Sequence, residues 1–435
     1  MMPKTPASQI PPEILAEILL LCAPSKYDHN AERLSSIIPE RSSVIYPSQV
    51  CHYWRSTALS TPALWSFILF LCERNEVFAR EAECAQVWLS RSAQCPISIE
   101  IVADDDDGDL VEEALQIFIP HCTRWKTMTA KTLCGDPEWW PVTGKLPLLE
   151  SVTLSCAAGE AFAIAPRLRH LRLHIMEPLR FEPLKIPWSQ LAHLELHIFD
   201  HDGVFQVHEI LQQTSNIATL RIHTSGPANH QASTILSCPS LSTLEIHSPD
   251  QPSIKWFLDG LALPALRNLK LSQTWHSCIT PFLARSACSL SSLDTHLREH
   301  NGFDILELAQ LPLSNSLAYL RVSFSRVEDW ETVVKSLMHR RGMPPFNNLR
   351  SLGMTCVFTP SRTNMECFAD MVASRWNRVD ADLHPESARC ATLSHVELYV
   401  NHLDIYLHHV AISRLRTLAA EGLDIKVRTC NEELV

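Results

Sequence analysis

The sequence predicts an α/β protein in which a small all-helical module precedes a repeat solenoid, with a curved parallel sheet and helices on its convex side. Three observations predict this fold. The chain of 435 residues is too long for one ordinary compact core. A short apolar pattern, x-L-x-x-L-x-L, returns ten times after residue 145, and internal repetition of this kind is typical of solenoids. The first seventy residues instead carry apolar side chains at helical spacing.

The N-terminal module, placed at 1–70, contains two expected helices separated by a long segment at 24–49. In IPPEILAEILLLCA, residues 10–23, apolar side chains recur one turn apart, and the two prolines stand where a first helical turn tolerates missing N–H groups. In PSQVCHYWRSTALSTPALWS, residues 47–66, a second helix is expected to start at Pro47. Two short helices bury little surface, so the module needs a partner surface.

These two segments resemble the F-box family, whose pattern is roughly L-P-x-E-[IL]-[IL]-x-x-[IL] followed by V-C-[RK]-x-W-R. IPPEILAEIL and QVCHYWRSTALSTPALW match it, and the ending LSTPALWS is typical of fungal F-box proteins. The resemblance implies docking onto the Skp adaptor of a Skp-cullin-F-box (SCF) ubiquitin ligase, and through the adaptor onto cullin. The positions that it implies for adaptor binding are Pro11, Ile14, Leu15, Ile18, Val50, Cys51 and Trp54. The open alternative is that these side chains fold back on the rest of the chain.

The repeat region is expected at 146–435, behind connecting helices and first irregular repeats at 71–145. The ten copies are spaced by 19 to 32 residues, with one interval of 44. An L-x-L strand cannot bury its leucines alone, so neighbouring copies stack into a parallel sheet. The copies resemble leucine-rich repeats of an irregular variety, over about 146–427. Helices between the strands are expected at 204–214, 253–263, 330–341 and 365–376.

One face of this sheet is predicted to carry charges of alternating sign. The residue between the last two apolar positions of each copy points away from the core, which gives the column Thr153, Arg172, Glu195, Arg221, Glu245, Lys270, Asp294, Arg321, Gly353 and Glu397. From Arg172 to Arg321 the sign alternates, so neighbours ~4.8 Å apart would attract each other and fix the strand register. Exposed ion pairs contribute only ~0–1 kcal/mol each. A chance pattern of solvated charges is the open alternative.

A column rich in histidine directly follows the copies: Ser155, His174, His197, His223, His247, Ser272, His296 and Ser323. Stacked imidazoles can bind zinc or titrate together near neutrality. Zinc, however, needs three or four groups that converge tetrahedrally, and a straight column does not provide them. We therefore expect a polar strip, with no metal and no other cofactor. His170, His193 and His395 lie one row back and are expected to be plain surface.

The predicted target-binding residues belong to these two columns: Arg172, His174, Glu195, His197, Arg221, His223, Glu245, His247, Lys270 and Arg321. No nucleophile elbow, P-loop, H-E-x-x-H or G-x-G-x-x-G motif occurs in the sequence. We therefore expect a non-catalytic protein, and the resemblance to the F-box family implies a substrate receptor of an SCF ubiquitin ligase that binds a protein target. The alternative is an adaptor-independent leucine-rich-repeat scaffold for protein interaction. A histidine-metal hydrolase is disfavoured because repeat solenoids rarely enclose a dry site.

Composition restricts the partners and the compartment. The chain has 37 Lys and Arg against 48 Asp and Glu, and this acidic balance argues against nucleic acid or anionic membrane as the main partner. The 15 cysteines form no C-x-x-C pair, so reduced thiols in the cytoplasm or nucleus are expected. The longest apolar run, residues 64–72, is far shorter than the ~20 residues of a membrane helix. The acidic segment 104–109 lacks the ligand spacing of a calcium loop.

Overall fold

In the computed structural model the chain divides into two compact units, unit 1 at Met1–Leu191 and unit 2 at Ala192–Val435. The described residues contain fourteen parallel strands of the main sheet, five in unit 1 and nine in unit 2. The α/β class and the long parallel sheet are therefore as predicted. The structure describes residues 10–23, 45–73, 76–103, 108–131, 140–154, 160–175, 185–199, 203–224, 235–248, 251–274, 276–297, 308, 311, 315–338, 346–376, 392–401, 407–430 and 432–435.

Unit 1 starts with the helical module, which consists of α1 (Pro12–Cys22), α3 (His52–Leu59) and the 3-10 helix η3 (Pro62–Trp65). The second helix begins at His52 and not at Pro47, so that prediction is wrong. The physical reason is the backbone of Cys51, which is extended, with φ −159° and ψ 173°, and separates α3 from a short helical turn at 45–48. Most of the predicted inter-helix segment, residues 24–44, lies outside the described residues.

The parallel sheet of unit 1 begins directly after this module. The apolar run that was too short for a membrane helix forms β1 (Phe67–Cys72), whose side chains are mostly buried because helices α4 and α5 pack against it. The strands β1 to β5 pair in chain order. The remaining elements are α4 (Glu76–Arg91), β2 (Ile97–Ala103), α5 (Gly108–Phe118), η4 (Ile119–Arg124), β3 (Trp125–Lys131), η5 (Trp140–Val142), β4 (Ser151–Leu154), β5 (His170–Ile175) and η6 (Trp188–Gln190).

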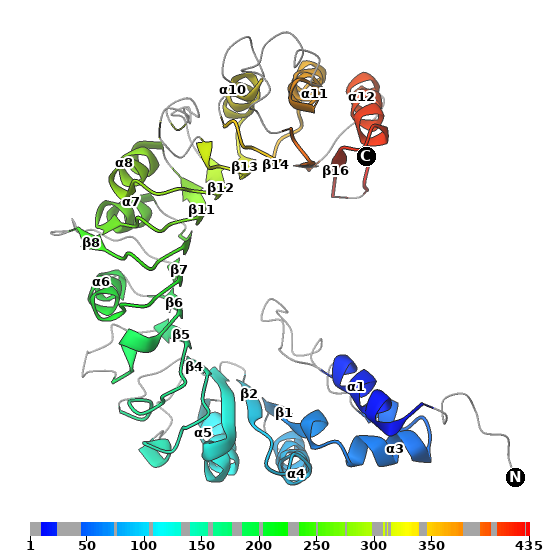
Figure 1. The fold of residues 1–435 in the computed structure, drawn as a ribbon, viewed down its shortest axis with the longest axis vertical. Coiled ribbons are helices and arrows are strands. Elements are labelled where there is room, and N and C mark those ends of the chain that lie inside the picture. Colours follow the sequence, from blue (N-terminus) through cyan, green and yellow to red (C-terminus); the bar gives the residue numbers. More distant parts are fainter. Residues whose placement is uncertain are drawn as a thin grey trace, which may run out of the picture. The chain divides into compact units, whose positions relative to one another are not determined.

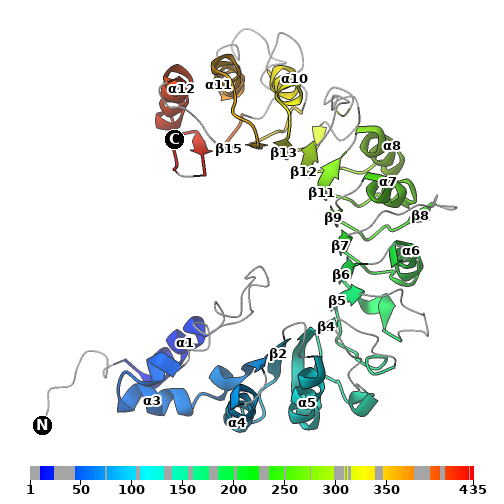
Figure 2. The ribbon, with the colours of Figure 1, turned by 180° about the vertical axis from the view of Figure 1, so that it is seen from behind.

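Unit 2 repeats a strand-and-helix alternation. Its strands lie on the inner side of an arc and its helices on the outer side, as predicted, and both views show this order (Figures 1 and 2). Two further strands, β8 (Leu236–Ser237) and β10 (Leu261–Ala262), form a small separate sheet. The other elements are β6 (His193–Ile198), α6 (Gly203–Gln213), β7 (Thr219–Thr224), β9 (Thr243–His247), α7 (Gln251–Asp259), β11 (Asn268–Thr274), α8 (His276–Ser286), β12 (Ser292–Leu297), β13 (Tyr319–Phe324), α10 (Val327–Leu337), β14 (Ser351–Cys356), α11 (Arg362–Trp376), β15 (His395–Val400), α12 (His409–Ala420) and β16 (Asp424–Arg428).

Every copy of the x-L-x-x-L-x-L pattern forms one strand of the sheet, from β4 to β15. The first apolar side chain of each copy is at most 1% exposed, because it turns into the core below the strand: Leu149, Leu168, Leu191, Ile217, Leu241, Leu266, Leu290, Leu317, Leu349 and Leu393. The four predicted helices correspond to α6, α7, α10 and α11. The residues between the buried positions alternate to the opposite face, which is the strand period of two.

Candidate functional site

Helix α1 carries apolar side chains on two faces. Leu15 and Leu19, one turn apart, are buried in a cluster with Ala58, Leu64 and Trp65. The other face is open to solvent, with Ile14 54% and Leu21 86% exposed and Ile18 partly exposed beside them. A helix that needs only one packed face normally carries polar residues on the other. The described part of the chain therefore leaves the outer apolar face of α1 uncovered.

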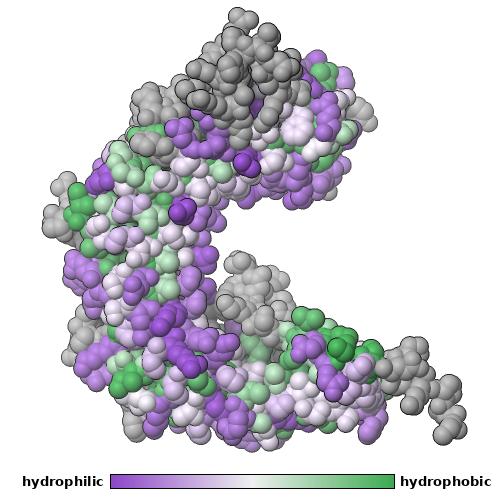
Figure 3. Space-filling model, viewed as in Figure 1, coloured by the Kyte–Doolittle hydropathy of each residue, from purple (hydrophilic) through white to green (hydrophobic). Residues whose placement is uncertain are grey.

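The second segment of the module adds further exposed apolar side chains. Val50, directly before α3, is 58% exposed, and Tyr46 and Leu59 are exposed as well. The exposed large apolar side chains of the module are here named the outer apolar surface. They are Ile14, Ile18, Leu21, Ile45, Tyr46, Val50 and Leu59. Hydrophobic surface gathers over α1 in the space-filling view (Figure 3). Several large exposed apolar side chains within one small module are a feature of interaction sites.

The structure divides the predicted adaptor-binding residues into two groups. Pro11, Ile14, Ile18 and Val50 are exposed, whereas Cys51 and Trp54 are half-buried. Trp54 packs against the Leu15 cluster. Leu15 is 0% exposed, so it is not part of the surface that is open to a partner in this structure. It lies on the inner face of α1, where it joins the helices of the module.

The inner face of the module is held by specific contacts. The hydroxyl of Tyr53 donates a hydrogen bond of 2.6 Å to the carbonyl oxygen of Ile10. The indole N–H of Trp65 donates one of 2.9 Å to the carbonyl oxygen of Ala58. Trp65 also meets Trp88 of α4 edge to face, with ring centroids 5.2 Å apart. The two hydrogen bonds hold the module together and the tryptophan contact joins it to α4. None of them covers the outer apolar surface.

A second candidate surface is the inner face of the strands in unit 2. The strand register places Glu195 opposite Arg221, Arg221 opposite Glu245 and Glu245 opposite Lys270. Lys270 and Asp294 are partners in the next pair of strands, and so are Asp294 and Arg321. The predicted alternation of charge is therefore present in space. Arg221 Nε lies 3.2 Å from a carboxylate oxygen of Glu245.

The ladder continues beyond Arg321 because Gly353 lies next to it. A Cβ atom at Gly353 would stand 3.0 Å from Cγ of Arg321. Without that atom, the Arg321 side chain crosses β14 and its Nη2 donates a hydrogen bond of 3.1 Å to Glu397 Oε2 on β15. Arg428 Nη1 lies 3.5 Å from the other oxygen of Glu397. The glycine that interrupts the charge pattern in the sequence thus allows an ion pair over two strands.

Two of the acids in the ladder, Glu245 and Asp294, have pKa values shifted in opposite directions. The pKa of Glu245 is lowered, mainly by the His247 imidazole and then by the charges of Arg221 and Lys270. The pKa of Asp294 is raised, because its burial outweighs the attraction of Lys270 and Arg321. Ionised Glu245 therefore stabilises the folded chain at neutral pH, whereas ionised Asp294 costs stability there.

The predicted histidine column is present on three neighbouring strands, β6, β7 and β9, and ends at the next strand, β11. The rings of His197 and His223 stack with centroids 4.3 Å apart, and those of His223 and His247 with centroids 4.6 Å apart. At Ser272 the register of β11 shifts, and the Ser272 hydroxyl donates to the carbonyl oxygen of Ser248 instead. The predicted place of Ser272 in the column is therefore wrong, and Ser155 lies outside the described residues.

The predicted target-binding residues do not all belong to one unit. Arg172 and His174 lie on β5 in unit 1, where both are half-buried. The other eight belong to unit 2. His296 follows the break in the column, and its Nε2 lies 3.3 Å from the Ser325 hydroxyl. His395, one row back, has its Nδ1 2.7 Å from Asp424 Oδ2, so its ring is within hydrogen-bond distance of a carboxylate across β15 and β16.

A potential ligand set was missed by the sequence analysis. Ligand atoms of Glu195, His197 and His223 lie within 4.8 Å of one another. Two of these ligands, His197 and His223, belong to the histidine column, whereas Glu195 belongs to the charge column beside it. The strand period of two, which puts Glu195 and His197 on the same face, is the signal that could have identified it.

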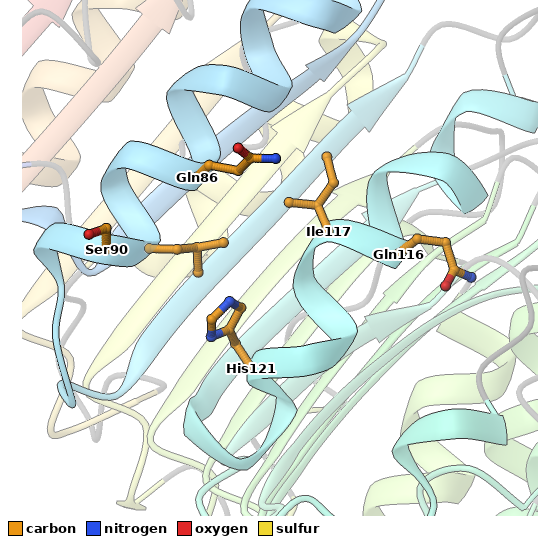
Figure 4. A pocket seen from close by; sticks show the side chains of 6 residues that line it. Gln86, Ser90, Gln116, Ile117 and His121 are labelled. Carbon is orange, nitrogen blue, oxygen red and sulfur yellow. The ribbon is translucent and has the colours of Figure 1, made fainter.

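Unit 1 also has an open groove of about 550 Å³ between α4 and α5. Polar and apolar side chains line it, among them Gln86, Gln116 and His121 (Figure 4). Burial, together with the nearby Arg124, lowers the pKa of His121. In the described part of the chain this groove holds no set of groups arranged for acid–base or nucleophilic chemistry.

Comparison with models of known protein families and with curated proteins gives no match for this chain. Within the described residues, no helix is both long enough and apolar enough to cross a membrane. The described cysteines are free thiols.

Proposed function

We propose that this chain is a non-catalytic substrate receptor of an SCF-type ubiquitin ligase of the cytoplasm or nucleus. Its N-terminal helices dock onto the Skp adaptor, and through the adaptor onto cullin, and its inner strand face binds a protein target. The observation that carries the proposal is the two-faced helix α1, with Leu15 and Leu19 sealed inside and Ile14, Ile18 and Leu21 outside. The sequence around these residues is the part that resembles the F-box.

The apolar burial that such a contact provides is comparable with the cost of association. Full burial of one large aliphatic side chain contributes roughly 1.5–3 kcal/mol. Ile14, Ile18, Leu21 and Val50 together then contribute on the order of 6–12 kcal/mol before the cost of association, which is itself about 4–15 kcal/mol. Contacts beyond these four side chains, such as those of Tyr46 in the same surface and of the neighbouring exposed Pro11, complete the interface.

The charges of the inner strand face support the target-binding half of the proposal, because they are not all positive or all negative. Its charges alternate from Glu195 to Arg321, so it presents no uniform field of the kind that attracts nucleic acid. A protein partner with matching donors and acceptors suits such a face, since alternating charges fix register and discriminate against wrong partners. The work of the receptor is then proximity: it raises the effective concentration of target lysines near the ubiquitin carrier.

A second candidate is an adaptor-independent scaffold in which the helical module only caps the sheet. The edge-to-face contact of Trp65 with Trp88 on α4 favours it, because a cap must pack on the end of the sheet. Point substitutions separate the two candidates. Deletion of residues 1–69 does not, because it removes Trp65 and half of β1.

The test is co-purification of the Skp adaptor and cullin with the full chain carrying Ile14→Asp and Val50→Asp. Both side chains are exposed, so the fold is expected to survive, which circular dichroism checks. The matched control is Val410→Asp on α12, an exposed valine far from the module in sequence. The receptor proposal predicts loss of both partners only in the first variant. Equal recovery from both variants, or from neither the variants nor the wild type, supports the scaffold.

A further inference from the structure

Three side chains on the inner face of unit 2 bring metal-binding atoms together. His197 Nε2 lies 2.8 Å from Glu195 Oε1, and His223 Nε2 lies 3.9 Å from the same oxygen. All three residues are half-buried. We propose that Glu195, His197 and His223 form a binding site for a divalent transition-metal ion of the zinc class.

The sheet holds the three ligands at fixed positions. Glu195 and His197 are two residues apart on β6, so they point to the same face. His197 and His223 are direct register partners on β6 and β7, which places their side chains next to each other. Ligands on paired strands are positioned more accurately than ligands on loops.

The donor set fits the chemistry of zinc. Imidazole nitrogen and carboxylate oxygen bind Zn²⁺ at about 2.0–2.2 Å, and three protein ligands with one open position are typical of zinc sites that bind a further group. Among available divalent ions, a site of nitrogen and oxygen ligands prefers copper, zinc and nickel to manganese or iron. The open position faces the inner surface, because all three side chains lie on that face.

The two imidazoles need one rotation to share an ion. Their planes are within 4° of parallel and their ring centroids are 4.3 Å apart, whereas the nitrogen lone pairs lie in the ring planes. His197 Nε2 already contacts the Glu195 carboxylate. Rotation of the His223 ring about its Cβ–Cγ bond turns its Nε2, now 3.9 Å away, toward the same carboxylate, and this torsion has a broad energy profile. The ion replaces the stacking contact with two coordinate bonds.

The neighbouring His247 and Glu245 do not form an equivalent set. Their closest atoms are 3.9 Å apart, and the Glu245 carboxylate also lies 3.2 Å from Arg221. A guanidinium at that distance competes with a cation for the carboxylate. His395 and Asp424, at 2.7 Å, match the His–carboxylate chemistry with two ligands instead of three. This second pair is a matched control on the same face.

The test is calorimetric titration of the tag-free, full-length, reduced chain with Zn²⁺. The variant Glu195→Gln/His197→Ala/His223→Ala is compared with His395→Ala/Asp424→Asn. We expect one zinc ion per chain in the wild type and in the control, and an affinity at least about tenfold weaker in the triple variant, since even outer-shell partners of metal ligands affect affinity 10–100-fold. No saturable heat in the wild type, or equal affinity in the triple variant, overturns the site.

Cobalt substitution distinguishes these ligands from the chain's exposed thiols, which include Cys22, Cys84 and Cys430. A Co²⁺ ion held by nitrogen and oxygen shows only weak visible bands. A thiolate-bound ion adds an intense charge-transfer band in the near ultraviolet. The proposal predicts the first spectrum, lost in the triple variant, and the second spectrum contradicts it. Adaptor binding is measured separately, so failure of the metal site leaves the proposed function untouched.

Discussion

The helical module and the inner face of unit 2 are both exposed surfaces, but they are built in opposite ways. The module exposes large aliphatic side chains over a sealed core, whereas the strand face exposes alternating charges and stacked imidazoles. An apolar surface gives affinity with little dependence on salt, because it works by burial. A charged surface gives orientation and selectivity but little net energy. Under the proposed function, the module suits a long-lived contact with the adaptor and the strand face an exchangeable contact with a target.

The largest expected effect is on the free energy of unfolding, and it should differ between substitutions on the inner and outer faces of α1. Leu15→Ala removes a fully buried side chain and is expected to lower the free energy of unfolding of the module by about 2–5 kcal/mol. Leu21→Ala, an exposed leucine on the same helix, is the control and should change it by less than about 0.5 kcal/mol. Urea unfolding followed by hydrogen exchange of α1 measures both. Equal effects would mean that the helix has no distinct inner face.

A slightly smaller effect is expected on adaptor binding. Ile14→Ala should weaken binding of the Skp adaptor by roughly 1.5–3 kcal/mol, or about 10–150-fold, because it removes most of one buried contact. Its stability should remain that of the wild type, since Ile14 is already exposed. Surface-based binding measured at two salt concentrations checks the apolar character. A strong salt dependence would contradict it.

Substitutions of two acidic residues, Glu245 and Asp294, test whether the charge ladder stabilises the sheet. Glu245→Lys removes an ion pair with Arg221 and puts like charges side by side, so it should lower the melting temperature by an amount that corresponds to about 1 kcal/mol. Asp294→Asn should leave the melting temperature unchanged or raise it, because burial already raises the pKa of Asp294. An unchanged melting temperature for Glu245→Lys would mean that the ladder does not stabilise the sheet.

The lowered pKa of Glu245 also predicts how the stability of the folded chain depends on pH. The folded pKa of Glu245 lies below its ordinary value, so its contribution is complete above the unfolded pKa of about 4.3 and is lost as the pH falls through the folded pKa. The melting-temperature difference between the wild type and Glu245→Gln should therefore be largest near pH 7 and should decrease as the pH falls from about 4.3 through the lowered folded pKa. Thermal unfolding across this range measures it. A difference that grows toward acid pH has the wrong sign.

The smallest effect concerns Gly353. Gly353→Ala places a methyl group against the stem of Arg321 and should weaken the pair of Arg321 with Glu397 by less than about 1 kcal/mol. The signature is a double-mutant cycle in which Glu397→Gln has less effect after Gly353→Ala than before. Independent effects would show that Arg321 moves aside without losing its partner.

Much of the strand region was predictable because its pattern is local. Ten repeats of buried leucines specify ten strands, and period-two alternation specifies which side chains face outward. Other elements lack such a pattern. The run FILFLC of β1 is apolar throughout because both of its faces are buried, so periodicity alone did not identify it as a strand. In α8, Pro281 lies within the helix. Because proline normally disfavours a helix interior, the sequence there does not predict a helix.

The sites were less predictable because they depend on spatial neighbours. The burial of Leu15 follows from packing against Leu64 and Trp65, more than forty positions away in the sequence. Motif matching treats Leu15 and Ile14 alike, although one faces inward and the other outward. The cluster of Glu195, His197 and His223 combines two rows of the sheet. The shift at Ser272 depends on a local irregularity of β11, for which the repeat pattern has no signal.

The most direct test of the central claim is calorimetric titration of the purified Skp adaptor into the full chain and into two matched variants. Ile14→Asp lies on the outer apolar surface, and Val410→Asp is an exposed valine on α12. The account predicts saturable one-to-one binding to the wild type and to Val410→Asp, and no measurable heat with Ile14→Asp. Equal binding to all three, or no binding to the wild type, would contradict it.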